Sequence, residues 1–258
     1  MKIAVIYKWA PDPQNASVSE SGEIDWGTKR TVSEYDPVAI RVGRILADET
    51  EAELIGITVG EKTASSPKAV QSAASRGLDR LIVVSDDELV SATPERYASV
   101  LAAILRNLDV DLILAGDASA DNGGKAVPGL LAGLLGIPSF GEVDSVSRPN
   151  AEYDFIITRK LNGKQQKLGI KGRAIIAVTT DAAPIPLIGM KDMMAARKKP
   201  VEVLELNELN FQGLPQTHGI ATLENVHKPV LKPRKQIVFD SDSAVAELIA
   251  ALKEEGVL

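Results

Sequence analysis

A loop in the middle of the chain carries the residues best suited to hold an anionic ligand. An apolar run ends at Gly116, small and polar residues follow, and a helical pattern begins near Val127. Free N–H groups at a helix N-terminus favour a phosphate, small side chains let a ligand approach the backbone, and Lys125 adds a cation. The same spacing also suits an ordinary strand-to-helix connection, so a nucleotide site and a plain turn are both open interpretations.

The loop does not match the known phosphate-binding motifs. Its Gly-Gly-Lys tripeptide ending at Lys125 resembles the end of a P-loop, but Ser119 stands where that motif needs Gly. Ala126 likewise replaces the Ser or Thr of the motif, and no GxGxxG sequence follows the first apolar run. A phosphate bound here would need a loop of another kind.

Composition excludes several other kinds of chemistry. The chain has no cysteine, which rules out thiolate zinc sites, iron–sulfur clusters and a cysteine nucleophile. The two histidines, His218 and His227, are far from the other candidates, so we expect no catalytic triad and no metal site. Redox chemistry would then require a non-covalently held organic cofactor. A net charge of −6 and an aromatic content of 4% argue against nucleic-acid binding.

The sequence favours a soluble, cytoplasmic protein. Residues 1–8 are charged too early for a signal peptide. The longest apolar stretch, residues 126–140, is interrupted by Pro and Gly and is shorter than the ~20 residues that span a bilayer. We therefore expect no membrane insertion.

Alternating strand and helix patterns predict the elements that position the loop. Runs rich in Ile, Val and Leu are typical of strands buried on both faces: Lys2–Tyr7, Glu53–Val59, Arg80–Val84 and Asp111–Ala115. Segments with helical spacing lie between these runs. One is Pro67–Arg76, where Gly77 is expected to end the helix, and the other is Tyr97–Leu108, where Thr93 and Pro94 are expected to begin it. The pattern predicts an α/β fold whose mostly parallel sheet has helices on both faces.

The second half has a different pattern. Strands are expected at Glu142–Ser147, Tyr153–Thr158, Lys164–Ile170 and Ala174–Thr180, as an antiparallel extension of the sheet with a type I′ turn at Asn162-Gly163.

Residues 200–233 have no sustained helical or strand period, which predicts an extended arm. A last strand, Gln236–Phe239, and an amphipathic helix, Ser241–Glu255, capped by Asp240 or Ser241, complete the prediction. We expect domains at 1–199 and 200–258, the latter an arm whose helix packs on this domain or on another chain.

Carboxyl ends of parallel strands share one edge of a sheet, so further residues should converge on the central loop. Residues 8–13 follow the first strand, Tyr35-Asp36-Pro37 leads into the next helix, and Val59-Gly60 closes the second strand. Asp36 fits a helix cap and a ligand contact equally well.

A second informative stretch is residues 184–200. Two prolines precede an apolar group, and a methionine-containing helix with an Arg-Lys-Lys end follows. Flexible thioethers suit an adaptable contact surface, whereas a core helix with a solvated basic end would show the same pattern. Both interpretations are open.

In these stretches the chain resembles the β subunit of electron transfer flavoproteins, in particular the Fix-type branch, over essentially its whole length. The matching segments are Tyr7-Lys8…Pro11-Asp12, Tyr35-Asp36…Ala39-Ile40, Ser75-Arg76-Gly77…Asp79…Leu81-Ile82-Val83-Val84, Asp111-Leu-Ile-Leu…Gly116-Asp117 and Met190-Lys191…Ala196…Lys198-Lys199-Pro200-Val201. Their order and spacing, rather than any single motif, carry the likeness.

The resemblance implies an adenine-nucleotide-hydrolase-like, Rossmann-like fold and an electron carrier without catalytic residues. Such a β subunit pairs with an α subunit that holds most of an FAD, and binds AMP or a second FAD itself, the latter in bifurcating members. It passes electrons from flavin dehydrogenases, commonly of the acyl-CoA type, to a downstream acceptor. Its recognition loop, here 184–197, would dock on the dehydrogenase through Leu187, with Ile188, Met190, Met193 and Met194 beside it.

The resemblance also implies the nucleotide-binding residues of this chain. They are Ile6, Tyr35, Asp36, Val38, Val59, Gly60, Gly116, Asp117, Ser119, Asp121, Asn122, Gly123, Gly124, Lys125, Ala126 and Val127. The family usually has Gln at position 126, an acidic residue at 123 and Gly where this chain has Pro128. The residues leave two alternatives: a stand-alone adenine-nucleotide-binding regulator similar to universal stress proteins, and a scaffold subunit whose cleft has decayed.

Overall fold

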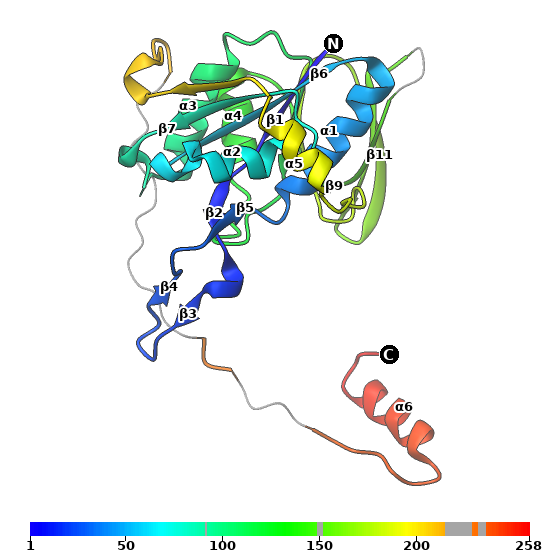
Figure 1. Ribbon diagram of the computed structural model, residues 1–258. Helices are drawn as coiled ribbons and strands as arrows, with labels where there is room; N and C mark the ends of the chain where they lie inside the picture. The colour runs from blue at the N-terminus through cyan, green and yellow to red at the C-terminus, as the bar shows by residue number, and fades with distance from the viewer. Residues whose placement is uncertain (91, 149–151, 215–228, 232–235) are drawn as a thin grey trace.

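A nine-stranded sheet organises the chain in a computed structural model that describes residues 1–90, 92–148, 152–214, 229–231 and 236–258 (Figure 1). The spatial order is β11-β10-β9-β12-β8-β1-β6-β7-β13. In chain order the strands are β1 (Lys2–Ile6), β6 (Glu53–Gly60), β7 (Arg80–Ser85), β8 (Leu112–Gly116), β9 (Ser139–Ser147), β10 (Phe155–Leu161), β11 (Lys164–Ile170), β12 (Ala174–Val178) and β13 (Val201–Leu204). The predicted α/β class, mostly parallel with an antiparallel part, is confirmed.

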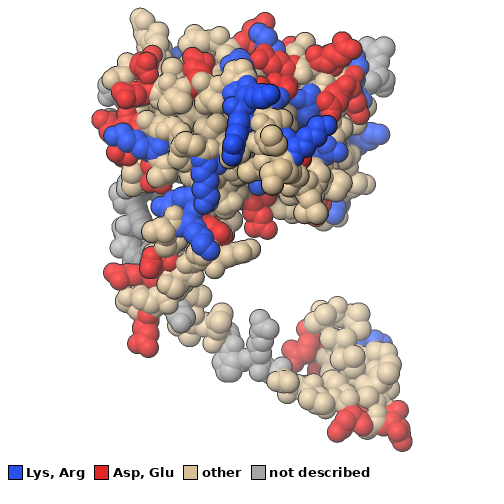
Figure 2. Space-filling model, viewed as in Figure 1, with Lys and Arg blue, Asp and Glu red and all other residues tan. Residues whose placement is uncertain are grey.

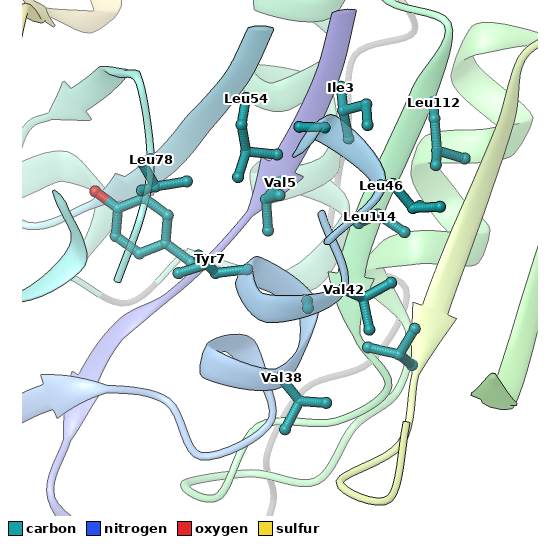
Figure 3. Close-up of a cluster of buried hydrophobic side chains, with 14 of the residues drawn as sticks. Ile3, Val5, Tyr7, Val38, Val42, Leu46, Leu54, Leu78, Leu112 and Leu114 are labelled. Carbon is teal, nitrogen blue, oxygen red and sulfur yellow. The ribbon is translucent and has the colours of Figure 1, made fainter. Parts of the chain in front are cut away.

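Helices cover both faces of this sheet. The helices are α1 (Asp36–Thr50), α2 (Pro67–Ala74), α3 (Pro94–Leu105), α4 (Val127–Leu135), α5 (Met190–Ala196) and α6 (Ala244–Glu254), with short 3-10 turns at Pro13–Asn15, Lys62–Ser65, Asp87–Leu89 and Leu206–Glu208. Successive residues of a strand point to opposite faces. Ile3 and Val5 of β1 therefore pack with α1 (Figure 3), whereas Ala4 joins the second core cluster, under α3 and α4.

The antiparallel part is smaller than predicted. Antiparallel pairing joins β9 to β10 and β10 to β11. The turn between β10 and β11 has positive φ at both Asn162 and Gly163, as the predicted type I′ turn requires. The prediction was wrong for β12, which lies parallel between β8 and β9. All five residues of β12 are apolar and buried, which suits a central parallel strand.

The sheet also continues beyond residue 199. The stretch predicted as an arm from residue 200 begins with β13, which pairs in parallel with β7 and forms the sheet edge. Leu206 then packs into the core under α3. Because Val201 and Val203 are exposed and alternate with Glu202 and Leu204, this short edge strand has only a weak apolar signal. Residues 215–228 and 232–235 of the expected arm, including both histidines, lie outside the described residues.

The C-terminal prediction is partly wrong. Residues 236–240 form no strand, and α6 begins at Ala244, after an N-cap at Ser243 rather than at Asp240 or Ser241. The hydroxyls of Ser241 and Ser243 both donate to Glu247, which organises the first turn. No residue of α6 is buried, and the helix lies apart from the sheet in Figure 1.

Two small ribbons that the sequence did not predict project from the end of β1. They are the antiparallel pairs β2 (Trp9–Pro11) with β5 (Arg30–Val32) and β3 (Ser17–Val18) with β4 (Ile24–Asp25) (Figure 1). In the described ranges, no helix has the length and apolar character needed to cross a lipid bilayer.

Close packing of α1 on the sheet gives a testable contrast between two helical glycines. A Cβ at Gly43 would lie 2.7 Å from Leu54 Cδ1 and 3.0 Å from Val5 Cγ2, whereas a Cβ at Gly133 of α4 would meet nothing within 4 Å. We expect Gly43→Ala to lower the free energy of unfolding by about 1–3 kcal/mol through overpacking. Gly133→Ala should raise it by about 0.5–1 kcal/mol. Urea unfolding measures both, and equal effects would contradict the packing described.

Candidate functional site

A pocket opens at the carboxyl ends of β1 and β8, where the strand order reverses. From β1 the chain proceeds to β6 and β7 on one side and then crosses to β8 on the other. In open α/β sheets ligands bind outside the carboxyl ends of strands at such a switch point. The N-terminal ends of α3 and α4 also border this pocket, through Pro94 and Val127.

Most of the residues predicted for nucleotide binding line this pocket. They are Ile6, Asp36, Val59, Gly116, Asp117, Ser119, Asn122, Gly124, Lys125, Ala126 and Val127. Five others are not among the lining residues: Tyr35, Val38, Gly60, Asp121 and Gly123. Val38 is buried in the core under α1, and Tyr35 packs against Gly116.

One wall of the pocket was not assigned to the site from the sequence. Ala92, Pro94, Tyr97 and Leu101 come from the start of α3 and the residues before it, and form an apolar surface together with Val59. The Tyr97 hydroxyl donates to the Leu89 carbonyl at 2.8 Å, which fixes the ring. Because α3 follows β7, the start of α3 also lies at the carboxyl edge of the sheet. This order of elements is visible in the sequence and could have assigned these residues to the site.

Asp36 forms part of the floor of the pocket. Its side chain is buried, and its Oδ2 accepts the Lys8 backbone N–H at 2.7 Å. Burial raises the pKa of this carboxyl to about 7, although the backbone hydrogen bonds from Lys8 and Gly116 oppose the shift. Asp36 is a first-turn residue of α1, with Tyr35 at the N-cap, so it joins α1 to the end of β1 rather than capping the helix.

Both lysines of the pocket are paired with carboxylates. Lys8 Nζ lies 2.5 Å from Asp121 Oδ2, and although burial opposes it, this partner lowers the pKa of Asp121. Lys125 Nζ lies 2.6 Å from Asp117 Oδ2, and this hydrogen bond raises the pKa of Lys125. Asp117 is itself buried and accepts the Glu142 N–H at 2.8 Å. The cations are thus held in place, and their charge is locally balanced.

The N-terminus of α4 offers a different anion-binding feature. Ala126 occupies the N-cap, and no side chain caps the first turn. The first N–H groups of a helix have no partner within it and carry partial positive charge. Asn122 Oδ1 accepts from the Ser119 hydroxyl at 2.7 Å and from the Gly124 N–H at 3.1 Å, which shapes the loop before the helix.

The predicted recognition loop lies on the surface. Leu187 is 98% exposed, and Ile188, Met190 and Met194 are exposed as well. Met193 differs, because it is half-buried and its carbonyl accepts from Gln71 Nε2 of α2 at 3.0 Å. Only Ala196 of α5 is buried. These exposed side chains exclude a core helix, and the contact surface stays a prediction.

The burial of Asp36 predicts a pH dependence of stability. Because its folded-state pKa of about 7 exceeds the ordinary 3.8, the folded chain holds a proton that the unfolded chain releases between these values. The free energy of unfolding that this proton contributes is fully present below pH 3.8 and is lost as the pH rises through about 7. We expect the stability of the parent relative to Asp36→Asn to fall across this window by up to ~1.4 kcal/mol per pH unit. Urea unfolding against pH tests this, and parallel curves would contradict it.

A family model described as the electron transfer flavoprotein domain matches residues 24–209 of the 258. The match begins after β1 and β2 and ends after β13. It includes α1, the ends of β6 and β8, the loop to α4 and the exposed segment around Leu187, and so most of the site just described. The chain belongs to the electron transfer flavoprotein family.

Proposed function

We propose that this chain is the β subunit of a heterodimeric electron transfer flavoprotein, that it is of the Fix-type branch, and that it holds an adenine nucleotide in the pocket. The observation that carries the proposal is the position of the pocket, at the switch point of the sheet, between an apolar wall on α3 and the uncapped start of α4. An apolar wall suits a purine ring, and a free helix N-terminus suits its phosphate.

The residues present fit a nucleotide with little phosphate charge. Val59, Tyr97 and Leu101 would hold the base, and the backbone from Gly124 to Val127 would face the phosphate. Because Lys8 and Lys125 are paired with Asp121 and Asp117, neither offers an unbalanced cation. Backbone dipoles would therefore carry most of the anion binding, which favours AMP over ATP. A second FAD is the alternative ligand, and would make electron bifurcation possible.

The redox group of the proposed heterodimer is an FAD held mainly by the α subunit and facing this chain; when bound, it supplies electron transfer in single or paired steps. This chain has no cysteine and would act as an electron-carrier subunit rather than an enzyme. Its own residues would exclude water from the flavin, hold the nucleotide and present a docking surface.

Two exposed surfaces support the proposed partners. The segment with Leu187 and Met190 would dock on an acyl-CoA-type flavin dehydrogenase, whose electrons pass through the complex to a downstream acceptor. The apolar face of α6, with Val245, Leu248 and Ile249, is exposed in the described chain and would pack on the α subunit. In this proposal the assembly is cytoplasmic and works by protein contacts.

Two substitutions at one position test the nucleotide site. Ala126→Asp and Ala126→Asn both add a side chain able to cap α4, but only Asp adds a negative charge where the phosphate would lie. Calorimetry on the purified chain should show AMP binding weakened at least about tenfold by Asp and much less by Asn.

Adenosine, which lacks the phosphate, should bind both variants alike. Equal AMP affinities of the Ala126→Asp and Ala126→Asn variants would show that the phosphate does not bind at the start of α4. Tight ATP binding by the parent chain, with no affinity for AMP, would instead favour a regulator similar to universal stress proteins.

A further inference from the structure

A network of charged side chains joins the loop before α4 to β9. Lys125 Nζ, which lies 2.6 Å from Asp117 Oδ2, is also 3.6 Å from Glu142 Oε1. Asp117 Oδ1 accepts the backbone N–H of Glu142 at 2.8 Å and so closes the network. Lys125 and Asp117 line the pocket, whereas Glu142 belongs to β9. One ammonium group therefore meets two carboxylates at the edge of the pocket.

Two residues of this network have a backbone conformation that disfavours side chains. The φ angle is +48° at Lys125 and +56° at Glu142, in the left-handed region where glycine is the usual residue. Among the described residues, Glu51 and Asn162 also have positive φ, but Glu51 is the C-cap of α1 and Asn162 lies in a type I′ turn. Neither local reason applies to Lys125, and Glu142 occupies a register shift of β9, where bulges often use glycine. Strained positions of this kind are common at ligand-binding sites.

Carboxyl groups outnumber ammonium groups around the pocket in the described part of the chain. The carboxyl groups are those of Asp36, Asp117, Asp121 and Glu142, and the ammonium groups are those of Lys8 and Lys125. Figure 2 shows that Lys and Arg side chains gather elsewhere, on the face that carries α2 and α5, although the whole chain has a net charge of −6. The shortage of cations at the pocket is therefore local, and it opposes binding of each phosphate beyond the first.

We propose that Asp117 and Glu142 are specificity-determining residues, which restrict the pocket to a nucleoside monophosphate. This inference rests on the proposed function and adds to it the number of phosphates that the site accepts and the residues that set this number. The first phosphate would face the backbone from Gly124 to Val127, a stretch that includes Lys125. A second phosphate that reaches the Lys125 ammonium also comes within contact distance of the two carboxylates that hold it.

Two effects then act against a nucleoside diphosphate. The Lys125 ammonium is already neutralised by Asp117, so it contributes little attraction to a further phosphate. Glu142 shares the same ammonium, so its carboxylate has no cation of its own among the ion pairs of the described residues. Like charges in contact near a protein surface repel strongly enough to change an affinity several-fold.

A purely structural network is the alternative, in which the ion pairs only hold the loop in its place. In that case, removal of a carboxylate would change the affinities for AMP and ADP by the same factor. Selection by charge would instead change the ratio of the two affinities, because only ADP carries the additional phosphate. The ratio of the two dissociation constants is therefore the quantity to measure.

Calorimetry on the full-length chain with AMP and with ADP, in the presence of a chelator that removes Mg²⁺, tests the proposal. Glu142→Gln removes the charge of an exposed side chain, and Asp117→Asn removes the buried charge while keeping an oxygen for the Glu142 N–H. A matched control, Asp109→Asn, makes the same change in net charge at an exposed residue before β8, at the opposite edge of the sheet.

We expect the parent chain to bind AMP at least about tenfold more tightly than ADP. Glu142→Gln should narrow this ratio about threefold, and Asp117→Asn about tenfold, because Asp117→Asn also releases the Lys125 ammonium. The control should keep the ratio of the parent. High salt should narrow the ratio of the parent, because it screens the exposed charges.

A parent chain that binds ADP as tightly as AMP would leave the nucleotide site standing and reject the selection. The inference is also overturned by a Glu142→Gln variant with an unchanged ratio, or by a control whose ratio narrows as much as that of the variants. The Glu142→Gln variant decides the question even if Asp117→Asn fails to fold, since the Glu142 side chain is exposed. A parent chain that binds neither nucleotide would contradict the proposed function itself, and this inference would fail with it.

Discussion

The carboxyl edge of the sheet is held by the buried side chain of Asp36. It accepts the N–H of Lys8 after β1, belongs to the first turn of α1, and lies against the end of β8 at Gly116. A Cβ at Gly116 would come within 2.6 Å of Asp36 Oδ1. Three elements thus meet at one carboxylate, whose burial is costly and is offset by backbone hydrogen bonds and by the surrounding core. The floor of the pocket, and the direction in which the loop leaves β8, depend on this contact.

Charge balance then determines which ligands the pocket suits. Lys8 and Lys125 neutralise Asp121 and Asp117: the first ion pair joins the loop before α4 to the residues after β1, and the second lies within the loop. The apolar wall of α3 and the uncapped start of α4 remain as the surfaces that a ligand can use.

Much of this arrangement could be predicted from the sequence. The apolar runs of β1, β6, β7 and β8 have a strong signal because both faces of each strand are buried, and together with the helices between them they place the loop after Gly116 at the carboxyl edge. Other features depend on tertiary contacts that no local pattern encodes. The short strand β13 alternates exposed Val with Glu and is recognisable only by its pairing with β7. Residues 236–239 have the composition of a strand but pair with no neighbour among the described residues. The ion pair between Lys125 and Asp117 likewise could not be predicted without the fold, because the sequence alone indicated that Lys125 was a free cation.

Purification of this chain together with the α subunit proposed as its partner tests the central claim most directly. The account predicts a yellow heterodimer whose absorbance spectrum and acid-released nucleotides give one FAD and one AMP per complex, or two FAD if the pocket takes the second flavin. A colourless chain that elutes separately from the α subunit and releases no nucleotide would contradict the account.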